Sequence, residues 1–166
     1  MDIMNTVKAI IVLGIDGKRV LAKYYDDKMN SVQFDKKIFF KTKSHKTRDE
    51  ILVEDSFIIL HRCVNDLHMY VVGNRNENPL ILDRVLCCLT EVVSTLLNRN
   101  TDSKSVFDNL DQLILALDEI CDGGIVLETD PNNVLQRVCL RDGVAEQSMA
   151  QVLQSATEHI KFPWIR

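Results

Sequence analysis

The residues best suited to chemistry in this chain lie in the segment LDEICDGGIVLETDP, from Leu117 to Pro131. Carboxylates surround its Gly-Gly pair at Asp118, Glu119, Asp122, Glu128 and Asp130. A calcium-binding EF-hand loop needs oxygen ligands at its first, third, fifth and twelfth positions. Counted from Asp118, the third position is Ile120 and the twelfth is Thr129, so two ligands are missing.

A structural role explains the same segment better than a metal site. Gly123 stands where a helix needs a left-handed residue to end, and Gly124 allows the chain to reverse into the IVLE that follows. We therefore predict a cap and turn at Gly123 and Gly124, with no bound metal. Carboxylates near a helix C-terminus oppose the helix dipole by about 0.5 kcal/mol, which a basic partner group would offset.

Other arrangements that could support catalysis also fail on spacing. GIDGKR has two residues between its glycines and Arg19 after the lysine, whereas a Walker loop needs four residues and a final Ser or Thr. The four histidines share no metal-ligand spacing, although His61 and His68 would meet across adjacent strands. The five cysteines form no CxxC pair and lie in apolar surroundings, as in a reduced cytosolic protein. With no nucleophile elbow present, the sequence predicts a binding protein without a cofactor rather than an enzyme.

Composition and charge narrow the class of protein. The chain has 166 residues, 46% hydrophobic and 27% charged, which indicates one globular domain. A net charge of −4 argues against a nucleic-acid binder. Residues 36–48 hold six Lys or Arg and no acid, whereas 102–130 hold eight acids and one base. Such runs are typical of solvated faces; the alternatives are two different partners, or an anionic membrane surface near the basic run. The apolar run 80–97 contains Asp83, Arg84 and Glu91, so we expect no membrane anchor.

Periodicity predicts the elements of the first half. TVKAIIVLGIDGKRVLAKYY is typical of a β-hairpin whose tight turn takes its positive φ from Asp16-Gly17. In SVQFDKKIFFKTKSHK, Phe34, Ile38 and Lys41 fall on one helical stripe, which predicts a short amphipathic helix. EILVEDSFIILHRCVNDLHMYVVG predicts three strands, with breaks near 54–55 and 65–66.

Helices are predicted for the second half. Asn78 is a good N-cap and Pro79 suits the first position of a helix that runs to about residue 97. Further helices are predicted from about 105 to 120, from 131 to 138 and around 149–160. This order predicts an α+β fold with helices packed on one antiparallel sheet. We expect a single domain over residues 1–162 and a short tail at 163–166.

Several segments resemble one family. VKAIIVLGIDGKRVLAKYYDD looks like the opening hairpin of the small chains of clathrin adaptors and coatomer. LDEICDGGIVLETDP, VLQRVCLR and VLQSATEHIK are similar to coatomer zeta chains in particular, and the resemblance extends from Val7 to Lys161. Sigma chains of the adaptors generally lack the Asp-Gly-Gly and Asp-Pro that stand here. The resemblance implies a longin-like (SNARE-like) domain, in which a five-stranded antiparallel sheet carries helices on both faces.

The resemblance also implies a function. Zeta chains are non-catalytic subunits of the coat of Golgi-derived vesicles, which serve Golgi-to-ER and intra-Golgi transport. They pair with the N-terminal solenoid of the gamma subunit, and an Arf-type GTPase recruits the whole complex to the cytosolic face of the membrane. The alternative is a sigma-type adaptor chain that helps to bind sorting signals. A longin-type regulator of a SNARE or GTPase would be followed by a coiled coil or membrane tail, which we do not expect after Arg166.

One departure from the family bears on sorting signals. Sigma chains that help to read acidic dileucine signals carry an arginine directly before the LAK of the second strand. Here Val20 holds that place and Arg19 precedes it. A shift of one residue along a strand turns a side chain to the other face, so we expect no binding of dileucine signals.

Aromatic neighbours beside the basic run predict the partner surface. Tyr24 and Tyr25 are adjacent on a strand and point to opposite faces, while adjacent residues of a helix lie about 100° apart. We therefore expect one ring of each pair to be exposed, as is typical of protein-binding patches. The predicted contacts with a larger helical-repeat chain are Tyr24 or Tyr25, Phe39 or Phe40, and Lys37 or Lys41 at the rim. The alternative is that the twist of the sheet buries both members of each pair.

Overall fold

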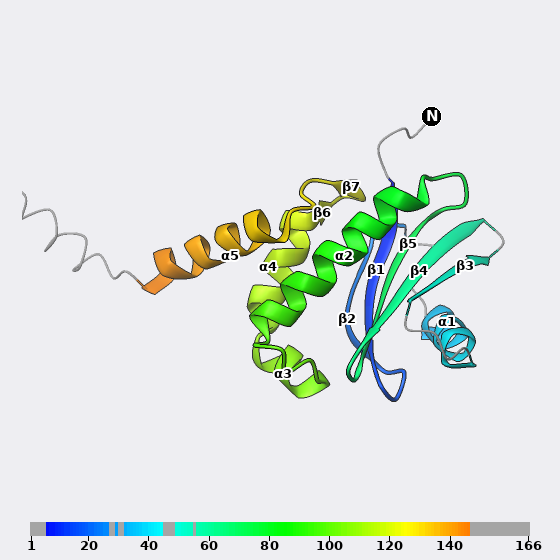
Figure 1. Ribbon diagram of the computed structural model, residues 1–166, viewed down its shortest axis with the longest axis horizontal. Coiled ribbons are helices and arrows are strands. Elements are labelled where there is room, and N and C mark those ends of the chain that lie inside the picture. Colours follow the sequence, from blue (N-terminus) through cyan, green and yellow to red (C-terminus); the bar gives the residue numbers. More distant parts are fainter. Residues whose placement is uncertain (1–5, 27–28, 30–31, 45–48, 55, 147–166) are drawn as a thin grey trace, which may run out of the picture.

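The computed structural model describes residues 6–26, 29, 32–44, 49–54 and 56–146. A five-stranded antiparallel sheet lies at its centre, with helices on both faces (Figure 1). The strands are β1 (Val7–Gly14), β2 (Arg19–Tyr24), β3 (Asp49–Glu54), β4 (Phe57–Val64) and β5 (Leu67–Asn74), in the spatial order β2-β1-β5-β4-β3. The helices are α1 (Val32–Ser44), α2 (Pro79–Leu96), α3 (Ser103–Asp108), α4 (Leu110–Ile120) and α5 (Pro131–Glu146). A short hairpin of β6 (Cys121–Asp122) and β7 (Ile125–Val126) joins α4 to α5.

The predicted α+β class and order of elements are confirmed. The β1–β2 turn contains Gly17 at φ 76°, the conformation predicted for Asp16-Gly17. The side chain of Asn78 accepts the backbone N–H of Leu80 at 3.0 Å, and Pro79 is the first residue of α2. The helix predicted at 149–160 and the tail at 163–166 lie outside the described residues.

Strand β1 forms the centre of two hydrophobic cores. Its neighbours in the sheet, β2 and β5, pair with both of its edges, and helices cover both of its faces. Ile10 and Val12 point toward the core beneath α2, α4 and the start of α5. Ala9, Ile11 and Leu13 point toward the second core, beneath α1. This explains why AIIVL, residues 9–13, is a continuous apolar run and not an alternating one.

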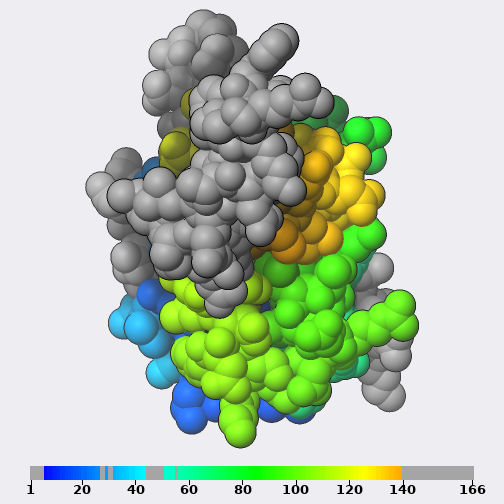
Figure 2. Space-filling model, turned by 90° about the vertical axis from the view of Figure 1, so that its left-hand side faces the viewer, coloured from blue at the N-terminus to red at the C-terminus, as the bar shows by residue number. Residues whose placement is uncertain are grey.

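The thicker layer contains α2, α4 and α5, which pack against one another on the face of the sheet opposite α1. Figure 2 views this layer from its end, where the surfaces of these three helices meet. None of the described helices is both long and apolar enough to cross a membrane.

Two predicted helices have different bounds in the structure. The helix expected from residue 105 to 120 is divided into α3 and α4 at Asn109, whose φ of −123° and ψ of 28° depart from helical values. The divided helix starts earlier than predicted because Asp102 caps the backbone N–H of Ser105 at 2.6 Å. Helix α5 continues to Glu146 and does not stop near Val138.

The predicted helix cap at Gly123 is wrong, whereas the predicted turn is present. Helix α4 already ends at Ile120, and Cys121 is extended at φ −150°. The carbonyl of Ile120 accepts the backbone N–H of Leu127 at 2.9 Å, so the returning chain satisfies this end of the helix without a left-handed residue. Gly123 and Gly124 have φ of 55° and 83° and form the centre of the β6–β7 turn, where a type I′ turn needs two positive values.

Candidate partner-binding site

The carboxylates of the acidic segment Leu117–Pro131 bind separate groups of the fold. Asp118 forms an ion pair with Lys23 of β2, and Glu119 lies 3.3 Å from Arg137 of α5. Glu128 accepts the backbone N–H groups of residues 130 and 129 at 3.0 and 2.9 Å, and these bonds lower the pKa of its carboxyl. Among the described residues, no three His, Cys, Asp or Glu side chains are grouped to hold a metal ion. The segment therefore joins β2, α4 and α5.

The adjacent tyrosines Tyr24 and Tyr25 lie on opposite faces of the sheet, as predicted. The hydroxyl of Tyr24 donates to Asp35 of α1 at 2.6 Å, and that of Tyr25 donates to the carbonyl of Cys121 at 2.8 Å. Burial, followed by these acceptors, raises the pKa of both phenols. Both rings are half-buried, and Tyr25 lies on the face away from α1. The structure thus separates Tyr25 from the other predicted contacts.

The two phenylalanines of α1 differ in exposure, as predicted for neighbours on a helix. Phe39 is buried against Gly17 and against the imidazole of His68, with ring centroids 5.2 Å apart. Phe40 is 68% exposed. Of the two, only Phe40 presents a large apolar surface to solvent.

The two lysines predicted at the rim of the partner surface form ion pairs with strand β3. Lys37 and Lys41 both form ion pairs with Glu54 at the end of β3, the first at 2.6 Å. Thr42 also ties α1 to the sheet, since its hydroxyl lies 2.8 Å from that of Tyr70 in β5. These contacts hold α1 in a fixed orientation and direct its remaining side chains outward.

An apolar groove of about 460 Å³ lies between α1 and the β1–β2 turn. Phe39 forms part of its wall, and a Cβ at Gly17 would approach that ring to 2.6 Å. The groove is lined by Asp16, Gly17, Lys18, Arg19, Val32, Asp35, Lys36, Phe39 and Phe40. Both carboxylates in this set are paired, Asp16 with Lys18 at 2.9 Å and Asp35 with Arg19 at 2.7 Å. The groove therefore combines apolar walls with one cation, Lys36, in excess of its paired charges.

The position of Arg19 corrects one prediction. Val12 pairs with Leu21 and Leu13 pairs with Arg19, so Val20 is the extra residue of a β-bulge. Val20 and Leu21 both pack toward α2 and α4, and Arg19 lies on the α1 face together with Tyr24. The shift of one residue in the sequence therefore does not turn Arg19 to the other face, because the bulge compensates for it. The guanidinium is bound to Asp35 and lies over the ring of Tyr24, 4.8 Å from its centroid.

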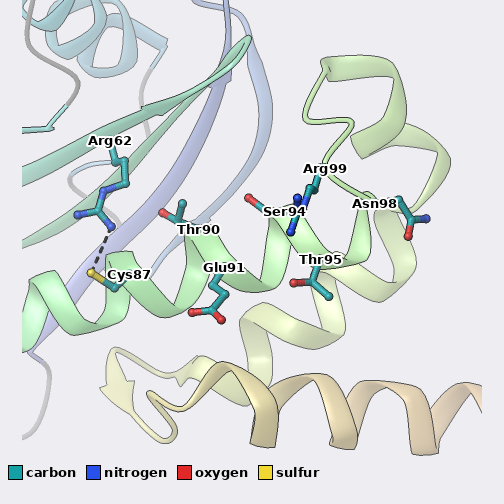
Figure 3. Close-up of a pocket in the computed structure, with 8 residues that line it drawn as sticks. All are labelled: Arg62, Cys87, Thr90, Glu91, Ser94, Thr95, Asn98 and Arg99. Carbon is teal, nitrogen blue, oxygen red and sulfur yellow. Dashed lines mark hydrogen bonds between the residues drawn. The ribbon is translucent and has the colours of Figure 1, made fainter.

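A second recess, of about 800 Å³, lies along α2 beside Arg62 of β4 (Figure 3). Arg62 donates to the Cys87 sulfur at 3.2 Å. The recess is lined by Arg62, Cys87, Thr90, Glu91, Ser94, Thr95, Asn98 and Arg99. Although most of these residues are polar, polar and apolar surface contribute about equally to the lining.

The two histidines that were expected to meet do so beneath α1. Nε2 of His61 lies 3.0 Å from Nδ1 of His68, and the rings are stacked with centroids 5.2 Å apart. Burial, followed by the charge of Lys43, lowers the pKa of His68. The pair packs against Phe39 and Tyr70, so it belongs to the packing of α1 on the sheet.

With this geometry described, the chain can be compared with known proteins. A family model of the clathrin adaptor complex small chain matches residues 6–145. This chain belongs to that family. The small chain is 44% identical to coatomer subunit zeta-1 of Homo sapiens, over 98% of its own length and 95% of the relative's. It is 40% identical to coatomer subunit zeta-1 of Arabidopsis thaliana, over 96% of its own length and 97% of the relative's.

A structural comparison shows the same fold. A chain of a homology model of the full-length AP-3 complex superposes with a TM-score of 0.64 at 17% identity, covering 84% of this small chain and 95% of that chain. The predicted longin-like architecture is confirmed, and the family shows that the small chain is a coat subunit.

The groove was missed at the level of the sequence, although one signal for it exists. Val32, Lys36 and Phe40 are four residues apart and so lie on one ridge of α1. The prediction considered only the adjacent pair of phenylalanines. It placed the surface on the side of the hairpin and this helix, but it included no residue of the β1–β2 turn and neither Val32 nor Lys36.

Proposed function

We propose that this small chain is the zeta-type subunit of a coatomer and pairs with the gamma subunit through the N-terminal solenoid of gamma. The observation that supports this most directly is the end-to-end similarity to zeta-1, at 44% identity over 98% of this chain. The two clusters of buried residues give the domain its own cores, so the pairing adds a surface contact to a folded module.

In this proposal the chain acts in Golgi-to-ER and intra-Golgi vesicle transport. It would be located in the cytosol and on the cytosolic face of Golgi membranes and coated vesicles. An Arf-type GTPase would act on it indirectly, by recruiting the assembled complex. The chain would have a structural role without catalysis, in keeping with relatives that are coat subunits.

Purification of the tagged, full-length chain from cytosol tests this proposal. We expect the large coatomer chains to co-purify in equal amounts, with gamma retained longest as salt is raised. A sigma chain of a clathrin adaptor, tagged in the same way, is the matched control. Recovery of adaptor large chains with this protein, or of the protein alone, would contradict the proposal.

The alternative role, as a sigma-type chain that binds sorting signals, has weaker support. To bind a peptide carboxylate, Arg19 would have to break its ion pair with Asp35. Asp35 is 2% exposed, so this would leave a buried carboxylate without that cation.

A further inference from the structure

The groove beside α1 is bordered by an exposed apolar ridge. Val32 is 61% exposed and Phe40 is 68% exposed, and Lys36 lies between them on the same ridge. The other side of α1, with Ile38 and Phe39, is buried on the sheet. An apolar ridge with one cation is the surface that a second helix packs against, because ridges of residues four apart fit the grooves of a neighbouring helix.

The charge around the ridge limits what can occupy it. The groove is lined by three cations and two carboxylates, and both carboxylates are already paired with Lys18 and Arg19. Lys37 and Lys41 share the single carboxylate of Glu54, so this part of α1 adds one positive charge in excess, although the chain as a whole carries a net charge of −4. This local reversal of charge favours an occupant with carboxylates beside its apolar face.

We propose that the ridge Val32, Lys36 and Phe40 seats an amphipathic helix of the larger coat chain, with apolar side chains over Phe40 and Val32 and a carboxylate at Lys36. The inference rests on the proposed pairing with the gamma subunit and assigns that contact to one surface. The ridge of three residues replaces the larger set of partner contacts that the sequence predicted. Tyr25 lies on the other face of the sheet, Phe39 is internal, and Lys37 and Lys41 are held by Glu54.

The binding test uses the full-length small chain and the gamma chain, with the dissociation constant measured at about 0.05 M and about 0.3 M salt. An exposed aromatic ring that becomes buried in an interface is a typical hot spot, so Phe40→Ala should weaken binding by ~10-fold or more. Lys36→Glu should weaken binding more strongly at the lower salt concentration, because it reverses a charge at the contact.

Two matched controls make the result specific. Val53 on β3 is 57% exposed, as apolar and open as Val32, and Lys104 on α3 is an exposed cation like Lys36. Val53→Ala and Lys104→Glu should bind as the wild type does. All four side chains are exposed, so thermal unfolding should show the same midpoint for every variant.

Photo-crosslinking gives an independent measurement. With p-benzoylphenylalanine in place of Phe40, we expect a crosslink to a helix of the gamma chain that carries both apolar and acidic residues. The same probe in place of Val53 should give none.

The outcomes separate the two proposals. If the wild-type chain binds gamma while Phe40→Ala and Lys36→Glu bind equally well, this inference is overturned and the pairing stands. If Val53→Ala alone weakens binding, the contact lies on β3. If Phe40→Ala changes self-association and leaves gamma binding intact, a second copy occupies the groove. If the wild-type chain does not bind gamma, both proposals fail.

Discussion

At the scale of single residues, the adjacent tyrosines join three layers of the molecule. Tyr24 contacts Asp35 on the side of α1, and Tyr25 contacts the end of α4 through the Cys121 carbonyl. The alternation of side chains along a strand makes this possible, because neighbours serve opposite faces. The last residues of β2 thus fix the edge strand between both helical layers.

The hydroxyl of Tyr25 should contribute measurably to stability. Tyr25→Phe removes the bond to Cys121 and leaves a half-buried carbonyl without this donor, so we expect the free energy of unfolding to fall by about 1 kcal/mol. Tyr25→Ala also removes the ring and should cost about 3 kcal/mol or more. Urea denaturation measures both. Equal stability of the Tyr25→Phe and wild-type chains would show that the hydroxyl bond has no net effect.

Residue-level predictions succeeded where the deciding neighbours are close in sequence. Asn78 caps α2 by accepting the backbone N–H of Leu80, two positions along the chain. Gly17 supplies the positive φ that the turn containing it requires. The face occupied by Arg19 could not be predicted in the same way. It depends on a bulge in β2 opposite Val12 and Leu13, which belong to another strand.

At the scale of elements, the β6–β7 turn has a sharp conformational requirement. Gly123 has φ 55°, and a Cβ there would meet nothing within 4 Å, so any penalty comes from the backbone. Gly123→Val should lower the free energy of unfolding by about 1–2 kcal/mol, because a β-branched residue resists positive φ. Gly123→Asn creates the Asn-Gly pair favoured in type I′ turns and should be nearly neutral.

Thermal unfolding of the two variants tests this requirement. Equal destabilisation by Val and Asn would mean that the side chain at this position collides with something and that the positive φ is not decisive.

The packing of α1 on β4 and β5 should weaken in mild acid. Burial lowers the pKa of His68 in the folded chain, whereas the unfolded chain has the ordinary value near 6.5. The unfolded state therefore binds more protons just below pH 6.5, and the free energy of unfolding falls as the pH decreases through that range. His68→Gln removes this titration. Denaturation midpoints between about pH 7.5 and 5.5 should show a shallower loss for this variant than for the wild type; equal slopes would contradict the assignment.

Element boundaries were predictable only where local signals are strong. Val106, Leu110 and Leu113 continue one apolar stripe, so periodicity alone joins α3 to α4 across Asn109. Strands β6 and β7 have two residues each, which is too short for any pattern. Helix α5 passes through Gly143, a residue that usually argues for an end.

At the scale of the whole molecule, the basic run of 36–48 should not act as a membrane anchor. Lys37 and Lys41 are paired with Glu54, and the chain carries a net charge of −4. A free Lys near an anionic surface contributes about 1 kcal/mol, so this arrangement leaves too little attraction at physiological salt.

Flotation with anionic liposomes provides the measurement. We expect the isolated chain to stay in the soluble fraction. Salt-sensitive co-flotation that is lost on replacing Lys36, Lys37, Lys41 and Lys43 with Glu would show that the run binds lipid directly.

The order of elements in the sequence was enough to predict the overall architecture, but it could not predict the groove. The groove depends on the distance between the β1–β2 turn and α1, which meet only because both pack at the same end of the sheet. Contacts between Gly17 and Phe39 arise from the complete fold, and no local pattern encodes them.

The position of β1 between β2 and β5 also sets an order in time. Its hairpin with β2 can form as soon as residue 24 is made, but Val7 pairs with Gly73, which is made 49 residues after residue 24. At a synthesis rate of ~5–20 residues per second, the growing chain carries an unpaired β1 edge for ~2–10 s. During this interval Ile10 and Val12 belong to a two-stranded ribbon without β5 and α2, which is a surface that chaperones bind and that aggregates. Newly made chains are therefore most vulnerable before β5 and α2 emerge from the ribosome.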